Sequence, residues 1–148
     1  GDILALNYYL DDELWQSKFF ENKYFKTGDL GKIDNDNLIV LGRIDDVINY
    51  GGKSIDPQQI EEEIFKTVEI KGYVTSISSK IYGSEIVFVV SNKEDLKNWD
   101  NKKSLLLNND CIIPSKITLL DDLPFTQNGK IKRAMLREIV VSKFKSNV

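Results

Sequence analysis

The stretch INYGGKSIDPQQIEEEIFKTV, residues 48–68, joins a hairpin signal to a helix signal. Its Gly51-Gly52 pair permits positive backbone φ angles and predicts the tip of a tight β-hairpin. Asp56 is typical of a helix N-cap, and Pro57 of the first helical position. Apolar residues then recur at every fourth position, at Ile60, Ile64 and Val68. This spacing predicts a helix with one buried face.

Downstream of residue 68, apolar patterns predict strands over 73–83, 85–91 and 115–123, the first two joined at Gly83-Ser84. A helix is expected over 94–110, with weaker periodicity. The final helix is expected from Arg133 to Phe144, and its buried side consists of Met135, Leu136, Ile139 and Val140.

Upstream, the polar run Asp34–Asn37 predicts a turn between two strands, and residues 38–41 are typical of a buried strand. The whole pattern predicts an α+β fold: a small mixed sheet with packed helices and an N-terminal β-hairpin, over residues 45–148. Residues 1–44 have the pattern of β-strands from the tail of a larger domain. Without that domain, we expect the strand at 38–41 to leave an apolar face uncovered.

The composition limits the classes of function. The chain has 148 residues, 41% of them hydrophobic and 29% charged, with a net charge of −3. This charge gives no reason to expect nucleic acid or an anionic membrane as a partner. A single cysteine, Cys111, excludes an internal disulfide, and the absence of histidine argues against a zinc or haem site. We therefore expect a cytoplasmic protein with no membrane span and no metal ligands in this chain.

Four polar motifs fall where loops are expected: TGD at 27–29, GRIDD at 42–46, NYGGKS at 49–54 and QNGKIKR at 127–133. Each has a plain structural interpretation. They are, in order, a capped turn, a surface ion pair of Arg43 with a nearby aspartate, a hairpin without phosphate-loop spacing, and a turn before a helix. The last interpretation leaves the basic residues unexplained, because positive charges at a helix N-terminus oppose the helix dipole. They suggest that an anion binds there.

In this order and spacing, the motifs YFKTGDLG, LGRIDDVINYGGKSIDPQQIE and LPFTQNGKIKRAMLRE resemble the late motifs of the acyl-adenylate-forming enzymes. This superfamily includes acyl-CoA synthetases, peptide-synthetase adenylation domains and luciferase. The upstream stretch ALNYYLDDELWQSKF is similar to the segment before the Thr-Gly-Asp motif. The resemblance covers nearly the whole chain. It implies the tail of the AMP-binding domain at 1–44 and a mobile C-terminal lid at 45–148.

The resemblance implies roles for individual residues. Asp29 corresponds to the aspartate that accepts hydrogen bonds from the ATP ribose, and Arg43 to the arginine that approaches the ribose and phosphates. Asp45 corresponds to the hinge about which the lid turns. Gly51 and Gly52 correspond to the hairpin along the path of the incoming thiol, where glycine leaves room beside the backbone.

Lys130 corresponds to the lysine that contacts ATP phosphate oxygens during adenylation, and it is the expected catalytic residue. A fixed ammonium stabilises the charge that develops as acyl-adenylate and pyrophosphate form. The basic residues Lys132, Arg133 and Arg137 have three interpretations: binding a CoA phosphate, binding an acidic carrier protein, or solubilising the helix.

This sequence departs from the family at Asn49 and Ser54, where many relatives carry lysine and arginine, and at Gln59, where glutamate is common. In relatives, the phosphate loop, the ligand of the Mg²⁺ that accompanies ATP, and the acyl pocket all lie upstream. The resemblance therefore implies that this chain needs its own N-terminal domain and does not catalyse adenylation without it.

The leading interpretation is the C-terminal part of an ATP-dependent ligase that converts a carboxylic acid into an acyl-adenylate and then into a thioester with CoA. One alternative is an adenylation enzyme that loads the phosphopantetheine of a carrier protein. Another is a non-catalytic, lid-like interaction module. Nucleic-acid binding through the last helix is a further alternative, disfavoured by the acidic total charge.

Overall fold

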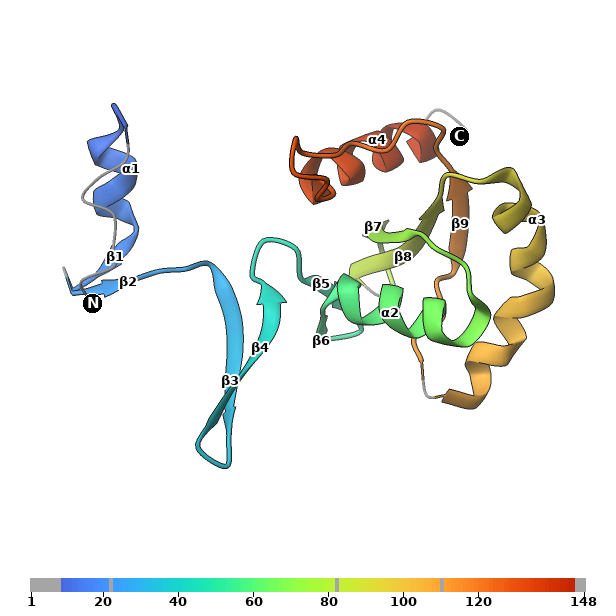
Figure 1. Ribbon diagram of the computed structural model, residues 1–148, viewed down its shortest axis with the longest axis horizontal. Coiled ribbons are helices and arrows are strands. Elements are labelled where there is room, and N and C mark those ends of the chain that lie inside the picture. The colour runs from blue at the N-terminus through green and yellow to red at the C-terminus, as the bar shows by residue number, and fades with distance from the viewer. Residues whose placement is uncertain (1–8, 22, 82, 110, 146–148) are drawn as a thin grey trace. The chain divides into compact units, whose positions relative to one another are not determined.

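The computed structural model describes residues 9–21, 23–81, 83–109 and 111–145 (Figure 1). The first residues of the stretch that begins at Ala5 therefore lie outside the described residues. The chain divides into two compact units, one ending at Asp45 and the other starting at Asp46. Each unit is described by itself. The assignment of residues 1–44 to a larger domain and of 45–148 to a lid stays a prediction.

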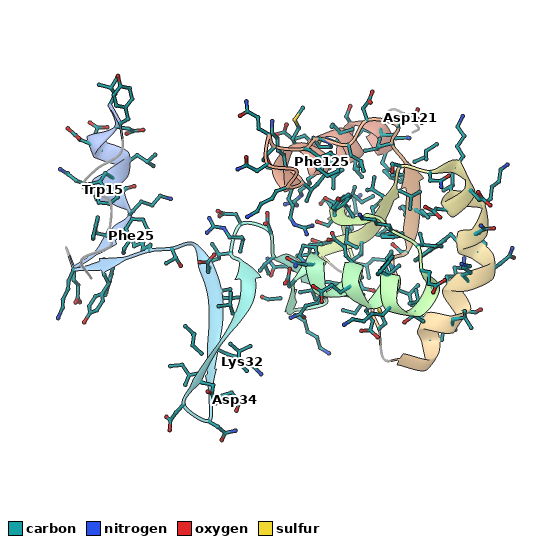
Figure 2. The ribbon with its side chains drawn as sticks, in the orientation of Figure 1. Trp15, Phe25, Lys32, Asp34, Asp121 and Phe125 are labelled. Atoms are coloured by element: carbon teal, nitrogen blue, oxygen red, sulfur yellow. The ribbon has the colours of Figure 1, made fainter. Side chains whose placement is uncertain are left out.

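The first unit begins with helix α1 (Asp12–Ser17), which Asp11 caps by accepting a hydrogen bond from the Leu14 N–H at 3.0 Å. Two short antiparallel strands follow, β1 (Phe19–Phe20) and β2 (Tyr24–Phe25). Trp15, Phe19 and Phe25 pack as an aromatic cluster with ring centroids 5.2–5.6 Å apart (Figure 2). This cluster connects α1 to the strands that precede the Thr-Gly-Asp motif.

A β-hairpin of β3 (Asp29–Asp34) and β4 (Asn37–Arg43) completes the first unit. The polar turn is confirmed, and its two central residues, Asn35 and Asp36, both have positive φ, as a tight hairpin turn requires. Within this chain, the burial expected for this strand is wrong at Leu38 and Val40, which are 72% and 64% exposed. The uncovered apolar face that we expected is present on this hairpin.

The second unit opens with the hairpin that the sequence predicts, β5 (Ile48–Tyr50) and β6 (Lys53–Ile55). Helix α2 (Pro57–Val68) follows, with Asp56 as N-cap accepting from the Gln58 N–H at 3.0 Å. The predicted face of α2 is buried, comprising Pro57, Ile60, Ile64 and Val68. Local signals therefore determine this part of the fold.

The sheet of the second unit contains β7 (Tyr73–Ser79), β8 (Gly83–Val90) and β9 (Lys116–Leu119) in the order β7-β8-β9. β7 and β8 are antiparallel, whereas β8 and β9 are parallel, so the sheet is mixed. Gly83 already belongs to β8 and pairs with Ser79. The connection therefore precedes the Gly83-Ser84 pair that the sequence indicated.

Strand β8 is buried on both faces, which explains its continuous apolar run. Ile86, Phe88 and Val90 pack with α2 and with Trp99 of helix α3 (Lys93–Lys102). The alternate residues Val87 and Val89 pack with helix α4 (Arg133–Lys145). The sheet lies between α2 and α4 (Figure 1). The predicted α+β architecture, with its small mixed sheet and N-terminal hairpin, is confirmed.

Two helical expectations need correction. The expected helix over 94–110 ends at Lys102 and continues as a 3-10 helix, η1 (Lys103–Asn109), which buries Leu106. In α4, Leu136 and Val140 are fully buried as expected, but Met135 is 49% exposed. The buried stripe of α4 is therefore narrower than the apolar pattern suggested: Leu136 and Val140 pack with β8, whereas Ile139 is only half-buried.

Candidate functional site

Asp29 and Arg43 are direct partners across the β3–β4 hairpin. Arg43 Nη1 donates to Asp29 Oδ1 at 3.0 Å and to the carbonyl oxygen of Thr27 at 2.6 Å. The Thr27 hydroxyl in turn accepts from the Asp29 N–H at 3.1 Å. The structure thus brings together, at the Thr-Gly-Asp turn, two of the three residues that the family resemblance assigns to the nucleotide.

Gly28 allows the guanidinium of Arg43 to lie directly over this turn. A Cβ at Gly28 would stand 2.8 Å from Arg43 Nη2, and its φ of +78° lies in the left-handed region. The Gly28 carbonyl also accepts from the Ile44 N–H at 2.9 Å. The motif therefore needs glycine for two reasons, the backbone conformation and the close approach of the arginine.

The ion pair of Asp29 and Arg43 shifts the pKa of the carboxyl although both side chains are exposed. The hydrogen bond from Arg43, followed by that from Thr27, holds the pKa of the Asp29 carboxyl below its usual range. The two side chains are 43% and 50% exposed, so the pair adds little to stability. An ionised carboxylate with further lone pairs beside an arginine is chemically suited to a polyhydroxylated, anionic ligand.

The hairpin tip at Gly51 and Gly52 is open. Both residues are exposed with φ of +56° and +80°, and, apart from the adjacent residues in the chain, no described residue has an atom within 4 Å of a Cβ built on either one. At the base of the tip, Asn49 and Ser54 are cross-strand partners, and Ser54 Oγ lies 3.5 Å from Asn49 Oδ1. The two departures from the family's basic residues therefore face each other across one hairpin.

Lys130 lies near the end of a closed loop, which we call the lysine loop, residues 125–131. Phe125 and Ile131 form an antiparallel bridge at its base, and the Thr126 N–H donates to the Lys130 carbonyl at 2.7 Å. The Thr126 hydroxyl accepts from the Lys130 N–H at 3.1 Å. Sequence reasoning missed Thr126, although a threonine hydroxyl that hydrogen-bonds to the backbone of its own loop is a common feature of turns.

The Lys130 side chain is exposed, and its ammonium makes no hydrogen bond or ion pair with any residue that the structure describes. Hydrogen bonds to Thr126 hold both the N–H and the carbonyl of Lys130, whereas the side chain is available to a ligand. That combination suits a residue that acts on an anionic ligand.

Arg133 pairs with a carboxylate of the same chain, that of Glu61. It donates through Nη1 and Nη2 to Glu61 Oε1 and Oε2 at 2.8 and 3.0 Å, and its side chain is only 16% exposed. A carboxylate at the start of α4 also compensates the unfavourable position of a cation there. The interpretation of Arg133 as a CoA- or carrier-binding residue is therefore wrong, whereas Lys132 and Arg137 are exposed and stay candidates.

The predicted site residues are divided between the two units. Asp29, Arg43 and the exposed Asp45 belong to the first unit, whereas the Gly51-Gly52 hairpin and Lys130 belong to the second. Asp45 is the last residue of its unit, at the boundary. Its function as a hinge stays a prediction.

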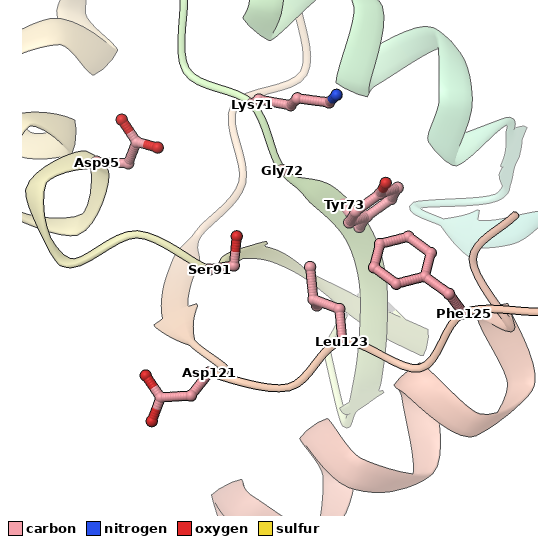
Figure 3. A pocket seen from close by; sticks show the side chains of 8 residues that line it. All are labelled: Lys71, Gly72, Tyr73, Ser91, Asp95, Asp121, Leu123 and Phe125. Carbon is pink, nitrogen blue, oxygen red and sulfur yellow. The ribbon is translucent and has the colours of Figure 1, made fainter. Parts of the chain in front are cut away.

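A pocket of about 360 Å³ lies on the second unit beside the base of the lysine loop (Figure 3). Its lining comprises Lys71, Gly72, Tyr73, Ser91, Asp95, Asp121, Leu123 and Phe125. The rings of Tyr73 and Phe125 meet edge to face with centroids 5.7 Å apart. Two carboxylates and one ammonium give this pocket a negative balance, which does not suit a phosphate.

The described ranges contain neither a metal-binding cluster nor a membrane-spanning helix. There, no three or more acidic, cysteine or histidine side chains are grouped so as to hold a metal ion. Among the described helices, none is both long enough and apolar enough to cross a membrane.

Comparison with known proteins identifies relatives that match most of this chain. No protein-family model matches it. The 2-succinylbenzoate–CoA ligase of Listeria innocua is 35% identical over 88% of this chain, and gramicidin S synthase 2 of Aneurinibacillus migulanus is 31% identical over 93%. The chain spans only 28% and 3% of these two proteins.

Solved structures agree with these relatives. The o-succinylbenzoate CoA synthetase of Bacillus subtilis, in complex with its acyl-adenylate intermediate, matches 84% of this chain with a TM-score of 0.66 and 26% identity. This chain covers 26% of that structure. Structures of ATP-bound enzymes are also among its neighbours.

Fold and relatives together define the class: the chain belongs to the acyl-adenylate-forming enzymes and corresponds to a C-terminal part of them. Its relatives within that class include both CoA ligases and peptide synthetases.

Proposed function

We propose that this chain is the C-terminal part of an AMP-forming acid–thiol ligase whose acceptor is CoA. The observation that carries the proposal is the division of the expected machinery at Asp45. Residues suited to the nucleotide lie before this boundary, and both expected reaction loops follow it. A lid that turns about Asp45 would use such a division to present its two loops in succession.

In the first half-reaction, a carboxylate oxygen attacks the α-phosphorus of ATP, and the bond from that phosphorus to the bridging oxygen of pyrophosphate breaks. Asp29 accepts hydrogen bonds from the ribose hydroxyls, and Arg43 approaches the ribose and phosphates. Lys130 places its ammonium, which has no partner among the described residues, on the phosphate oxygens, where negative charge increases. Mg²⁺ bound with ATP would shield phosphate charge, and its protein ligands are proposed to lie in the AMP-binding domain of the complete ligase.

In the second half-reaction, the thiol sulfur attacks the acyl carbonyl carbon, the bond from that carbon to the AMP oxygen breaks, and the thiol proton is released. Gly51 and Gly52 line the path of the thiol, since the absence of side chains leaves room for a narrow pantetheine arm. The proposal includes a cytoplasmic location, and the net charge of −3 gives no reason to add a nucleic-acid partner.

Loading of a carrier protein is the second candidate, because gramicidin S synthase 2 matches 93% of this chain. The neutral Asn49–Ser54 pair at the base of the hairpin does not favour either acceptor by its charge. The two candidates differ in the acceptor that they require, and this difference is directly measurable.

The test uses the complete ligase that contains this chain. A panel of carboxylic acids is screened for acid-dependent exchange of pyrophosphate into ATP, and AMP release is then measured with free CoA or with a phosphopantetheinylated carrier protein. Exchange followed by CoA-dependent AMP release supports the proposal. Release with the carrier protein only supports the second candidate, and no exchange with any acid favours a non-catalytic lid.

A further inference from the structure

A largely buried charge cluster lies in the second unit, outside the expected reaction loops. Arg133 at the start of α4 pairs with Glu61 of α2, and these side chains are 16% and 12% exposed. Asp46, at the start of the unit, places Oδ2 3.7 Å from Arg133 Nε and is 29% exposed. A guanidinium held by two carboxylates at this depth is a fixed point in the unit.

The cluster also secures the edge strand β7. The Val74 N–H donates to Glu61 Oε1 at 2.7 Å, and the Val74 carbonyl accepts from Arg133 Nη1 at 3.3 Å. β7 is bonded to β8 in the described sheet, and these contacts satisfy its backbone groups at Val74. Arg133 is therefore fixed relative to α2 and to the sheet at the same time.

This fixed point is three residues from Lys130 in the sequence. Between them, the Lys132 N–H donates to the Pro124 carbonyl at 2.8 Å, and Ile131 bridges Phe125. These bonds close the base of the lysine loop just before α4 begins. The orientation of Arg133 is thus transmitted to the loop through a short, hydrogen-bonded segment.

We propose that Arg133 is a positioning residue that couples the hinge to the lysine loop. Its guanidinium joins Asp46, which follows the expected hinge Asp45, to the base of the loop that presents Lys130. Rotation of the unit then delivers Lys130 in one orientation. This inference rests on the proposed function for its catalytic consequence, whereas the mechanical coupling is testable by itself.

The geometry requires arginine. The planar fork engages both oxygens of Glu61, the Val74 carbonyl and the side of Asp46 together. Lysine would keep the charge but replace the fork by a single point donor. Arg133→Lys therefore removes the positioning while leaving Glu61 with a cation, and Glu61→Gln makes the complementary change while keeping a hydrogen-bonding group.

The coupling is tested by amide hydrogen exchange on the 148-residue chain. In Arg133→Lys and Glu61→Gln, we expect the protection of the Thr126 and Lys132 amides to fall by about tenfold, with the β5–β6 hairpin unchanged. Glu85→Gln is the matched control, because Glu85 pairs with Lys116 at 2.6 Å elsewhere in the unit. Unchanged protection of the loop in both variants, or an equal loss in the control, would overturn the coupling.

The catalytic consequence is tested in the complete ligase with the same three variants. We expect kcat for ATP–pyrophosphate exchange to fall by about 10- to 100-fold in Arg133→Lys, whereas KM for ATP and thiol transfer from a prepared acyl-adenylate change by less than about threefold. A merely structural role predicts equal losses in both half-reactions, in proportion to the loss in Tm, and that result would overturn the proposal.

A wild-type ligase without exchange would refute the proposed function instead, and the hydrogen-exchange result would still decide whether Arg133 holds the lysine loop. The two failures are therefore distinguishable.

Discussion

Three glycines offer a matched perturbation of the two half-reactions. Gly51 and Gly52 at the hairpin tip and Gly129 in the lysine loop have φ of +56°, +80° and +74°. Apart from the adjacent residues in the chain, no described residue has an atom within 4 Å of a Cβ added to any of them. Alanine at each position therefore meets backbone strain but no steric clash. Differences in activity among the variants then show which loop acts in which half-reaction, because only the position of the added methyl group differs.

The magnitude follows from the backbone. An L-residue in the left-handed region costs about 1–2 kcal/mol, and alanine recovers about 0.4–1 kcal/mol by restricting the unfolded chain. The net loss is about 1 kcal/mol, which lowers Tm by about 4–8 °C for a domain of this size. We expect the three variants to have similar Tm values, measured by differential scanning calorimetry.

Activity should separate the same variants. In the complete ligase, Gly52→Ala should slow thiol transfer from a prepared acyl-adenylate by about tenfold, equivalent to about 1.4 kcal/mol, and leave ATP–pyrophosphate exchange unchanged. Gly129→Ala should do the reverse, because it disturbs the turn beside Lys130. Equal losses in both half-reactions for either variant, with matched Tm values, would refute the assignment of the two loops.

Two further predictions concern the first unit and the core. Because Arg43 lowers the pKa of Asp29 in the folded state, Arg43→Met should raise the titration midpoint of the Asp29 carboxyl, measured by NMR. The stability that the pair contributes is present above the unfolded-state pKa and is lost as pH falls through the folded-state pKa. An unchanged midpoint in the variant would contradict the contact between Arg43 and Asp29. Leu136 is fully buried against Val87 and Val89, and Leu136→Ala should reduce the free energy of unfolding by about 2–5 kcal/mol in a urea titration, with a loss under about 1 kcal/mol counting against that packing.

Sequence patterns predicted the elements whose signals are local. The Gly51-Gly52 tip, the Asp56 N-cap and the buried stripe of α2 each depend on residues within one or two helical turns, and all three are present. Met135 shows where this reasoning fails. The helical pattern identified two adjacent apolar rows on α4, but only tertiary packing decides which row meets the sheet.

The site contacts that the sequence did not predict depend on register and on long-range pairing. The plain interpretation of GRIDD paired Arg43 with a nearby aspartate, and the β3–β4 register places Arg43 opposite Asp29. Likewise, the basic start of α4 predicted an anion without naming it. That anion is Glu61, 72 residues earlier in the chain, and no local pattern carries such information.

Lys130 is proposed to stabilise the negative charge that develops on the phosphate oxygens during adenylation. The most direct test of this proposal is acid-dependent ATP–pyrophosphate exchange by the complete ligase, comparing Lys130→Ala with Lys132→Ala, an exposed lysine two residues away. We predict that exchange falls by about 100-fold or more in Lys130→Ala, as for the loss of one strong transition-state contact, and by less than about threefold in Lys132→Ala. Exchange that survives the loss of Lys130, or that falls equally in both variants, would contradict the account.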